Sequence, residues 1–397
     1  MPDIGGIRTM SIPRILYIAP HWPGAPAYGA QQRVLQIGHL LKKMGNVSLV
    51  VLTVPSAEEK WRSRTKTEFN IARVVTAQSI GQRGVLSRLR HELDSRYVDA
   101  VQPTDRQAVL NLLSQHDVVW VHTMSAANSL GIYQWPHSVL DMDDIPSRVY
   151  ESSARVGSSL SRRLLDRRMS LIWKRREMRL AERFKVLMVC SENDRRYLGM
   201  DHVRVLPNGF QRVSNIDRFP SHPSRIGFIG SFEYAPNVEG MRWFCAQVWP
   251  KIKEQLPDAC LRVVGDGTDI ASEWGGDVHG LGRVEDAGSE ISTWSAMIVP
   301  IRRGGGTRIK VLEGFARRCP VVATKLGAFG YDINDGEEVF LTDEPNQFAV
   351  RCIELIKLPQ VAETMANSAH QWFLKFRTWE SYEDIVRAAV ESVRRKN

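Results

Sequence analysis

The sequence lacks a long apolar run and any cysteine pattern typical of a metal site or a disulfide scaffold. Its apolar stretches, such as Val186–Cys190, have the length of a β-strand, whereas a membrane-spanning helix needs roughly 18–20 residues. The N-terminal segment has no long apolar core behind a basic start, so it does not resemble a signal peptide. The cysteines number 5 and include no Cys-x-x-Cys pair, which favours reduced thiols in a cytosolic protein.

No compositional extreme is present either, apart from the charge. Hydrophobic residues make up 43% and charged residues 24% of the 397 residues, which excludes a disordered or a collagen-like chain and is typical of a soluble globular enzyme of two or three domains. Lys and Arg number 53 against 44 Asp and Glu, a formal net charge of +9. This excess favours one of three partners: nucleic acid, an anionic membrane surface or a phosphate-bearing substrate.

Short apolar runs alternate with helical patterns along the whole chain, which predicts an α/β fold with parallel sheets. Each half begins with a strand that enters a glycine-containing loop or turn, at Arg14–Pro20 and at Arg225–Gly230. We therefore expect two doubly wound, Rossmann-like domains that face each other across a cleft, with ligands outside the carboxyl ends of the strands. The expected bounds are 1–210 for the N-terminal domain, 211–224 for a hinge, 225–375 for the C-terminal domain and 376–397 for a final helix that packs back toward the N-terminal domain.

The stretch from Ala296 to Thr324 is the most informative for chemistry. A strand ends, the triplet Gly304-Gly305-Gly306 follows, and a helix is expected to begin near Thr307, which could be its N-cap. Arg308 and Lys310 then lie in the first turn, where cations oppose the helix dipole at a cost of roughly 0.3–1 kcal/mol. Because glycine N–H groups and a helix N-terminus attract anions, we predict a diphosphate bound by this segment.

Glu313 lies three residues after Lys310 and so shares its face of the helix. One interpretation is that its carboxylate accepts both hydroxyls of a ribose, one turn below the phosphates. The other is that Glu313 pairs with Lys310 or Arg317 on a solvated face.

This segment resembles the donor-binding signature of the retaining glycosyltransferases of the GT-B fold, the group 1 or family 4 enzymes. The resemblance covers nearly the whole chain, since Val205–Gly209, Ile226–Ser231 with Pro236-Asn237, Val263–Gly267 and Val278–Gly282 follow in the family's order. It implies transfer of a sugar from a nucleotide-diphosphate donor to a glycan or lipid-linked acceptor with retention of configuration, without a metal or another cofactor. The Gly-Gly-Gly-Thr-Arg-x-Lys variant is most similar to a bacterial polysaccharide sugar-transferase subgroup.

Two departures from the family pattern concern the donor site. Gly305 stands where the family has the first Glu of its Glu-x7-Glu pair, while Glu313 matches the second. The basic residues that usually follow the C-terminal domain's first glycine turn are absent after Gly230, and Arg308 and Lys310 are candidates to replace their charge.

Three acidic residues gather after a predicted strand of the N-terminal half, at Asp141, Asp143 and Asp144. By the family's order Asp143 and Asp144 are the catalytic candidates, and Asp141 lies on the acceptor side. Clustered carboxylates can orient an acceptor hydroxyl, stabilise a developing oxocarbenium ion or bind a divalent cation, although the family's fold usually works without one. They can equally be turn and capping residues.

Three further residues are expected on the acceptor side of the cleft: Gly29, Arg33 and His122. Gly29 matches the family's glycine loop. Arg33 either contacts a phosphate or lies on the surface, and the surface is favoured; His122 is more simply a structural histidine with a satisfied partner than a ligand.

The segment Ser161–Lys185 carries ten Lys or Arg and three Asp or Glu, and so accounts for most of the net charge. Its apolar residues recur at broadly helical spacing: Leu164, Leu165, Met169, Ile172, Trp173, Leu180 and Phe184. This is either a helix packed on the N-terminal sheet with a solvated basic face, which is favoured, or an amphipathic helix on an anionic membrane. Nucleic-acid binding ranks third because no recognition motif accompanies the charge.

The function expected from the sequence is a glycosyltransferase of cell-envelope or exopolysaccharide synthesis, cytoplasmic and either free or membrane-associated at the inner face. A nucleotide-sugar epimerase or hydrolase on the same fold, and a non-catalytic nucleotide-sugar-binding relative, are the alternatives. No serine-hydrolase, zinc-protease or P-loop motif is present in the sequence, which fits a reaction without a covalent nucleophile.

Overall fold

The computed structural model describes residues 12–24, 30–53, 67–77, 101–156, 159–214, 217–304 and 307–395. The chain divides into two compact units. The first unit comprises the described residues of Met1–Asp143, Leu171–Leu206 and Tyr382–Asn397. The second unit comprises those of Asp144–Ser170 and Pro207–Ser381.

The first unit is built on a sheet of seven parallel strands in the order β3-β2-β1-β4-β5-β6-β7. Its strands are β1 (Arg14–Ala19), β2 (Asn46–Thr53), β3 (Asn70–Thr76), β4 (Val118–His122), β5 (Ser138–Met142), β6 (Val186–Val189) and β7 (Val203–Val205). The central strands β4 and β5 are buried along their whole length, as expected for parallel strands covered on both faces.

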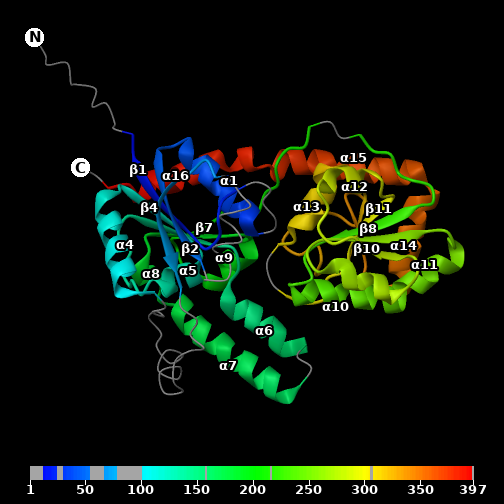
Figure 1. The fold of residues 1–397 in the computed structure, drawn as a ribbon, viewed down its shortest axis with the longest axis horizontal. Helices are drawn as coiled ribbons and strands as arrows, with labels where there is room; N and C mark the ends of the chain where they lie inside the picture. Colours follow the sequence, from blue (N-terminus) through cyan, green and yellow to red (C-terminus); the bar gives the residue numbers. More distant parts are fainter. Residues whose placement is uncertain are drawn as a thin grey trace, which may run out of the picture. The chain divides into compact units, whose positions relative to one another are not determined.

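The helices of this part of the chain fill the connections between the strands (Figure 1). They are α1 (Ala30–Lys42), α4 (Pro103–Gln115), α5 (Met124–Ser129), α8 (Leu180–Arg183), α9 (Glu192–Leu198) and, from the end of the chain, α16 (Glu383–Val393). The last helix lies beside α1, and Lys43 forms an ion pair of 2.9 Å with Glu383 there. The C-terminal residues therefore fold onto the sheet with which the chain begins.

The second unit is built on a sheet of six parallel strands in the order β10-β9-β8-β11-β12-β13. Its strands are β8 (Arg225–Ile229), β9 (Cys260–Val264), β10 (Val278–Gly280), β11 (Ala296–Val299), β12 (Val321–Ala323) and β13 (Phe340–Leu341). Strand β8 packs closely against Trp294, a buried residue between α12 (Ala287–Ser292) and β11, because a Cβ on Gly227 would lie 1.9 Å from its ring.

Helices α10 (Ala235–Trp243) and α11 (Trp249–Gln255) run along one side of this sheet, and α13 (Ile309–Ala316) and α15 (Pro359–Phe376) along the other (Figure 1). The remaining helical segments are η3 (Thr268–Trp274), α12 (Ala287–Ser292), α14 (Pro345–Lys357) and η4 (Trp379–Tyr382). After α10 the chain passes through a π-helical segment, η2 (Phe244–Val248). It continues as α11 with Pro250 in the first turn, where no intrahelical N–H bond is lost.

Two further helices, α6 (Pro146–Val156) and α7 (Leu160–Glu177), form a hairpin. The expected domain bounds placed this whole region in the N-terminal domain, but the structure groups residues 144–170 with the second unit. Contacts within that unit explain the difference, since the backbone N–H of Gly304 donates to the Ser152 hydroxyl at 3.3 Å. The guanidinium of Arg148 also lies 5.9 Å from the centre of the Phe329 ring.

Candidate functional site

The strand order of each sheet marks one position where polar residues are expected to gather. In the first sheet β1 and β4 are neighbours, and in the second β8 and β11 are neighbours, although neither pair is consecutive in the chain. The connections on the two sides of such a point leave in opposite directions, which opens a crevice at the carboxyl ends of the strands. The candidate residues of both units lie at these strand ends.

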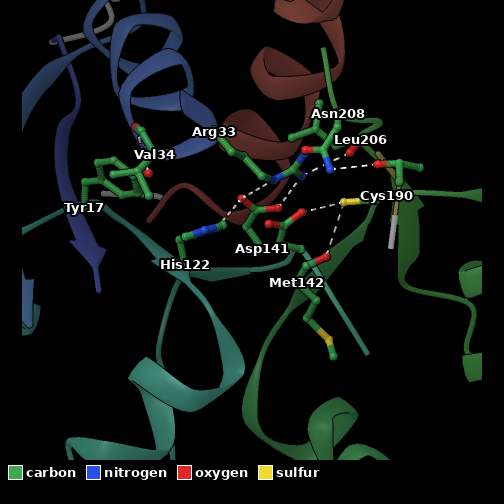
Figure 2. Close-up of polar contacts among 11 residues, drawn as sticks. Tyr17, Arg33, Val34, His122, Asp141, Met142, Cys190, Leu206 and Asn208 are labelled. Atoms are coloured by element: carbon green, nitrogen blue, oxygen red, sulfur yellow. Dashed lines mark hydrogen bonds and ion pairs between the residues drawn. The ribbon is translucent and has the colours of Figure 1, made fainter. Parts of the chain in front are cut away.

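In the first unit, three ionisable side chains form one buried network at this edge (Figure 2). Asp141, on β5, accepts hydrogen bonds from the Nε and Nη2 atoms of Arg33, on α1, at 3.1 and 2.6 Å. Nδ1 of His122, the last residue of β4, lies 2.8 Å from Oδ2 of Asp141, the oxygen that also accepts from Nε of Arg33. Arg33 also donates to the carbonyl of Leu206 at 3.0 Å. The network ties β4, β5 and α1 together.

All three side chains are excluded from solvent, with exposures of 0% for Arg33 and Asp141 and 1% for His122. Burial on its own raises the pKa of Asp141, but the charge of Arg33 and the hydrogen bond from His122 outweigh it and lower the pKa to about 2. The favoured prediction for Arg33, a surface role, is therefore wrong, because its guanidinium is the partner of a buried carboxylate. His122 is paired with Asp141, in agreement with the favoured interpretation of a structural histidine.

Beside this network lies a second group, made of His21, Asp143 and Cys190. The thiol of Cys190 donates to a carboxylate oxygen of Asp143 at 3.4 Å and to the carbonyl of Met142 at 3.7 Å. Burial and, next, the nearby His122 lower the pKa of His21 to about 4, against the opposing charge of Asp143. His21 is therefore a neutral imidazole at pH 7. Asp144 is exposed.

Sequence reasoning missed His21 as a site residue. The available signal was its position directly after the first strand and Pro20, since the carboxyl end of a central parallel strand is a frequent ligand position. Gly29, predicted on the acceptor side, lies outside the described residues.

In the second unit, Lys310 and Asn237 meet beneath the turn that follows β8. The Lys310 ammonium donates to Oδ1 of Asn237 at 2.7 Å and lies 4.2 Å above the Phe228 ring. The amide of Asn237 in turn donates to the carbonyl of Ser231 at 2.7 Å. A Cβ on Gly230 would approach both the lysine and the asparagine side chains to 2.8 Å, so only glycine fits this turn without a shift of its neighbours.

Arg308 lies next to this lysine and is itself buried. It donates to the Tyr234 hydroxyl at 3.4 Å and to the carbonyl of Arg303 at 3.3 Å. Burial and, next, the charge of Arg308 lower the pKa of Lys310 well below its ordinary value. Two cations held together at the start of α13 make this position strongly attractive to an anion.

Glu313 lies one turn further along α13 and forms an ion pair of 3.3 Å with Arg317. Burial raises its pKa, while Arg317 opposes the rise. The side chains of this pair are only 14% and 18% exposed, so the pairing foreseen as one alternative exists but not on a solvated face. The role of Glu313 toward a ribose stays a prediction.

Thr307 is not the N-cap of α13, contrary to expectation. The helix begins at Ile309 with Arg308 in the capping position, and the Thr307 hydroxyl instead accepts a hydrogen bond of 2.9 Å from Asn208. Gly304 has the φ of 101° that favours glycine. Gly305 and Gly306 lie outside the described residues.

Within the described ranges, no group of three or more His, Cys, Asp or Glu side chains is arranged to hold a metal ion. Of the helices that the structure describes, none combines the length and the apolar character needed to cross a bilayer.

A comparison with protein families bears on the second unit. Residues 223–357 match the family described as Glycosyl transferases group 1. This segment runs from just before β8 to the end of α14 and so includes Asn237, Arg308 and Lys310.

Among curated proteins, the chain is 32% identical to a phosphatidyl-myo-inositol mannosyltransferase of Mycobacterium leprae over 156 residues, which are 35% of this chain and 40% of that protein. The chain matches only about two-fifths of the length of the first curated relatives.

Solved structures match over the whole length. Anabaena Alr3699/HepE, solved in complex with UDP and glucose, is 16% identical with a TM-score of 0.61, covering 96% of this chain and all (100%) of that one. WaaG, described as a glycosyltransferase involved in lipopolysaccharide biosynthesis, is 15% identical with a TM-score of 0.63, covering 94% of this chain and 99% of the other. The chain has the GT-B type of fold, with two parallel-sheet, Rossmann-like domains.

Proposed function

We propose that this protein is a glycosyltransferase that moves a sugar from a nucleotide-diphosphate donor to a glycan or lipid-linked acceptor, with retention of configuration. The observation that carries the proposal is the pair of buried or partly buried cations, Arg308 and Lys310, at the N-terminus of α13. The match of residues 223–357 to group 1 glycosyl transferases and the UDP bound by Anabaena HepE support it.

The donor site would be formed by the carboxyl edge of the second sheet. At Gly304 and Thr307 the backbone would approach the diphosphate, and Arg308 and Lys310 would balance its charge. Glu313 would accept the ribose hydroxyls. Asn237 orients the lysine through the 2.7 Å hydrogen bond, so it is a positioning residue.

In the proposed reaction the bond between the anomeric carbon and the donor phosphate breaks, and the electron pair leaves with the diphosphate. The acceptor oxygen forms the new bond on the same face of the sugar, and its proton passes to the departing phosphate. Charge therefore develops on the leaving diphosphate, where Arg308 and Lys310 stabilise it most. No covalent intermediate, metal or cofactor is required in this proposal.

The acceptor would be bound on the side of Asp143 and Asp144, the catalytic candidates, of which Asp143 ends the first unit and Asp144 begins the second. The partly buried Asp143 is held by the Cys190 thiol, whereas Asp144 is exposed, so Asp143 is the better fixed of the two for orienting an acceptor hydroxyl. Arg33, Asp141 and His122 would hold the strand ends rather than touch the acceptor. The names of the mannosyltransferase relative and of WaaG favour a lipid-linked or envelope glycan as acceptor.

Calorimetric titration with nucleoside diphosphates tests the donor site. Lys310→Gln should weaken binding about 10- to 150-fold, since a hydrogen bond to a charged group contributes roughly 1.5–3 kcal/mol. The matched control is Lys357→Gln, which removes an exposed lysine of the same unit and should leave the affinity unchanged. Equal affinities of the wild type and Lys310→Gln would refute the site.

Activity is tested separately, by incubating the protein with nucleotide sugars and lipid-linked acceptors and determining the anomeric configuration of the product by NMR. Release of a free sugar or of an epimer without transfer would point to the hydrolase or epimerase alternative. Tight donor binding without turnover on any acceptor would favour a non-catalytic binding protein.

A further inference from the structure

Helix α7 has a buried face and an exposed face that differ sharply in charge. The buried side chains are Asp166, Ile172, Arg176 and Glu177, at helical spacing. Both acidic residues of the helix are among them, with Asp166 2% and Glu177 1% exposed. Both carboxylates of α7 are therefore buried, although Asp166 still forms an ion pair of 3.4 Å with the exposed Arg162.

Every exposed charge on α7 is positive. The exposed basic residues are Arg162, Arg163, Arg167, Arg168, Lys174 and Arg175. Of these cations, Arg162 forms an ion pair of 3.4 Å with Asp166, and Arg163 donates to the carbonyl of Ala154 at 3.1 Å. The exposed surface of the helix also carries Arg167, Arg168, Lys174 and Arg175.

Large apolar side chains lie among these cations instead of packing in the core. Leu160 is 74%, Leu164 56% and Leu171 62% exposed, and Met178, directly after the helix, is 68% exposed. Their spacing of four, seven and seven residues keeps them on one side of a helix. Leu164 and Leu165 belong to the same helical apolar pattern as Ile172, but of these three side chains only Ile172 is buried, and both leucines are exposed to water.

Exposed cations together with exposed leucines distinguish between the possible binding partners of this face. A second copy of this helix would bring Arg167 and Lys174 against the same cations, and like charges repel at short distance. Nucleic acid would use the cations but would gain little from exposed leucines. An anionic bilayer uses both, because the cations attract its headgroups while the leucines enter the interface.

We infer that the exposed face of α7, defined by Leu160, Leu164, Leu171, Met178 and the basic residues between them, is a docking surface for an anionic phospholipid membrane. The helix lies in the plane of the headgroups, with the leucines pointing toward the acyl chains. This surface rests on α7 alone and is independent of the proposed function, although it would bring a transferase to lipid-linked acceptors.

Vesicle co-sedimentation of the full-length protein tests the inference, with phosphatidylcholine vesicles that contain or lack phosphatidylglycerol. The wild type should bind only the anionic vesicles and should be released by salt. Two double variants separate the contributions: Arg167→Gln with Arg175→Gln for charge, and Leu164→Gln with Leu171→Gln for insertion. Each should lower the partition coefficient more than tenfold, since a basic residue near such a surface contributes about fivefold.

The matched control combines Leu110→Gln and Lys357→Gln, which remove an exposed leucine and an exposed lysine elsewhere, and it should bind as the wild type does. Circular dichroism of each variant shows that its fold is retained. Equal binding to neutral vesicles, unchanged binding by both double variants, or binding of nucleic acid or dimer formation in place of vesicle binding would overturn the inference.

Discussion

Replacing Asp141 by Asn should destabilise the first unit strongly, because it removes the charge that balances a buried guanidinium. In the wild type, Arg33 and Asp141 are both 0% exposed, and the carboxylate accepts two bonds from Arg33, at 3.1 and 2.6 Å. The arginine keeps its proton under all ordinary conditions, so the variant leaves a buried guanidinium without the carboxylate that pairs with it. Breaking a buried pair in this way costs about 3–5 kcal/mol of unfolding free energy.

The contribution of Asp141 to stability should also be visible in the pH dependence of the wild type. The pKa of Asp141 is about 2 in the folded protein against an ordinary value of 3.8, so its contribution is present in full above 3.8 and is lost as the pH falls toward 2. The difference corresponds to roughly 2 kcal/mol. The unfolding free energy of the wild type should therefore fall steeply from about pH 4 to about pH 2, and that of Asp141→Asn should fall less steeply.

Urea unfolding followed by circular dichroism measures the loss of unfolding free energy in Asp141→Asn. Hydrogen–deuterium exchange of the peptide that contains β5 shows whether this loss lies in the first unit. Asp105→Asn is the matched control, since its pair with Arg73 has side-chain exposures of 18% and 42% and should contribute less than about 1 kcal/mol. Combining Arg33→Met with Asp141→Leu should recover most of the stability, because no charge remains buried. A loss in Asp141→Asn no larger than in Asp105→Asn would refute the reasoning.

Three further expectations follow from the second unit. Gly227→Ala should lower the free energy of unfolding by about 1–3 kcal/mol or more, because the new methyl group would lie 1.9 Å from the fully buried Trp294. Gly276→Ala is the control: its methyl group would have no atom within 4 Å, so this variant should unfold at the urea midpoint of the wild type. Equal midpoints for the two variants would contradict the close packing of Gly227. Diphosphate binding should be coupled to proton uptake, because a bound anion raises the lowered pKa of Lys310, and the affinity should therefore fall as the pH rises. Calorimetry in two buffers of different ionisation enthalpy measures the proton uptake, and Lys310→Gln should abolish it. Asp286→Ala should lower the free energy of unfolding by about 1 kcal/mol, because it removes the N-cap that accepts from the N–H groups of Gly288 and Ser289. Asp286→Asn keeps a capping side chain, so in thermal unfolding it should retain most of the wild-type stability.

Much of the fold follows from local pattern. The strands expected at Arg14–Pro20 and Arg225–Gly230 and the strand-length run Val186–Cys190 agree with the structure within one residue, because an apolar run bounded by turns has few alternatives. The π-helical segment Phe244–Val248 could not be predicted, because such a segment has no sequence signature.

The candidate site was less predictable than the strands around it. The glycine turns and the cations of Arg308 and Lys310 could be identified from residue type and spacing alone. Their partners could not, because Asn237 lies 73 residues before Lys310, and nothing local indicates that their side chains meet. Thr307 has the composition of a cap, yet its hydroxyl pairs with Asn208, 99 residues away.

The sequence by itself determined the alternation of strands and helices, the glycine turn after the first strand of the second unit and the concentration of positive charge between Ser161 and Lys185. The tertiary structure decided which charges are buried and which are exposed. It places Arg33 beside Asp141, 108 residues away, and turns Leu164 and Leu171 outward while Asp166 and Glu177 turn inward. The physical reason is that helical periodicity fixes which residues share a face, but only the packing of neighbouring elements fixes which face meets the core.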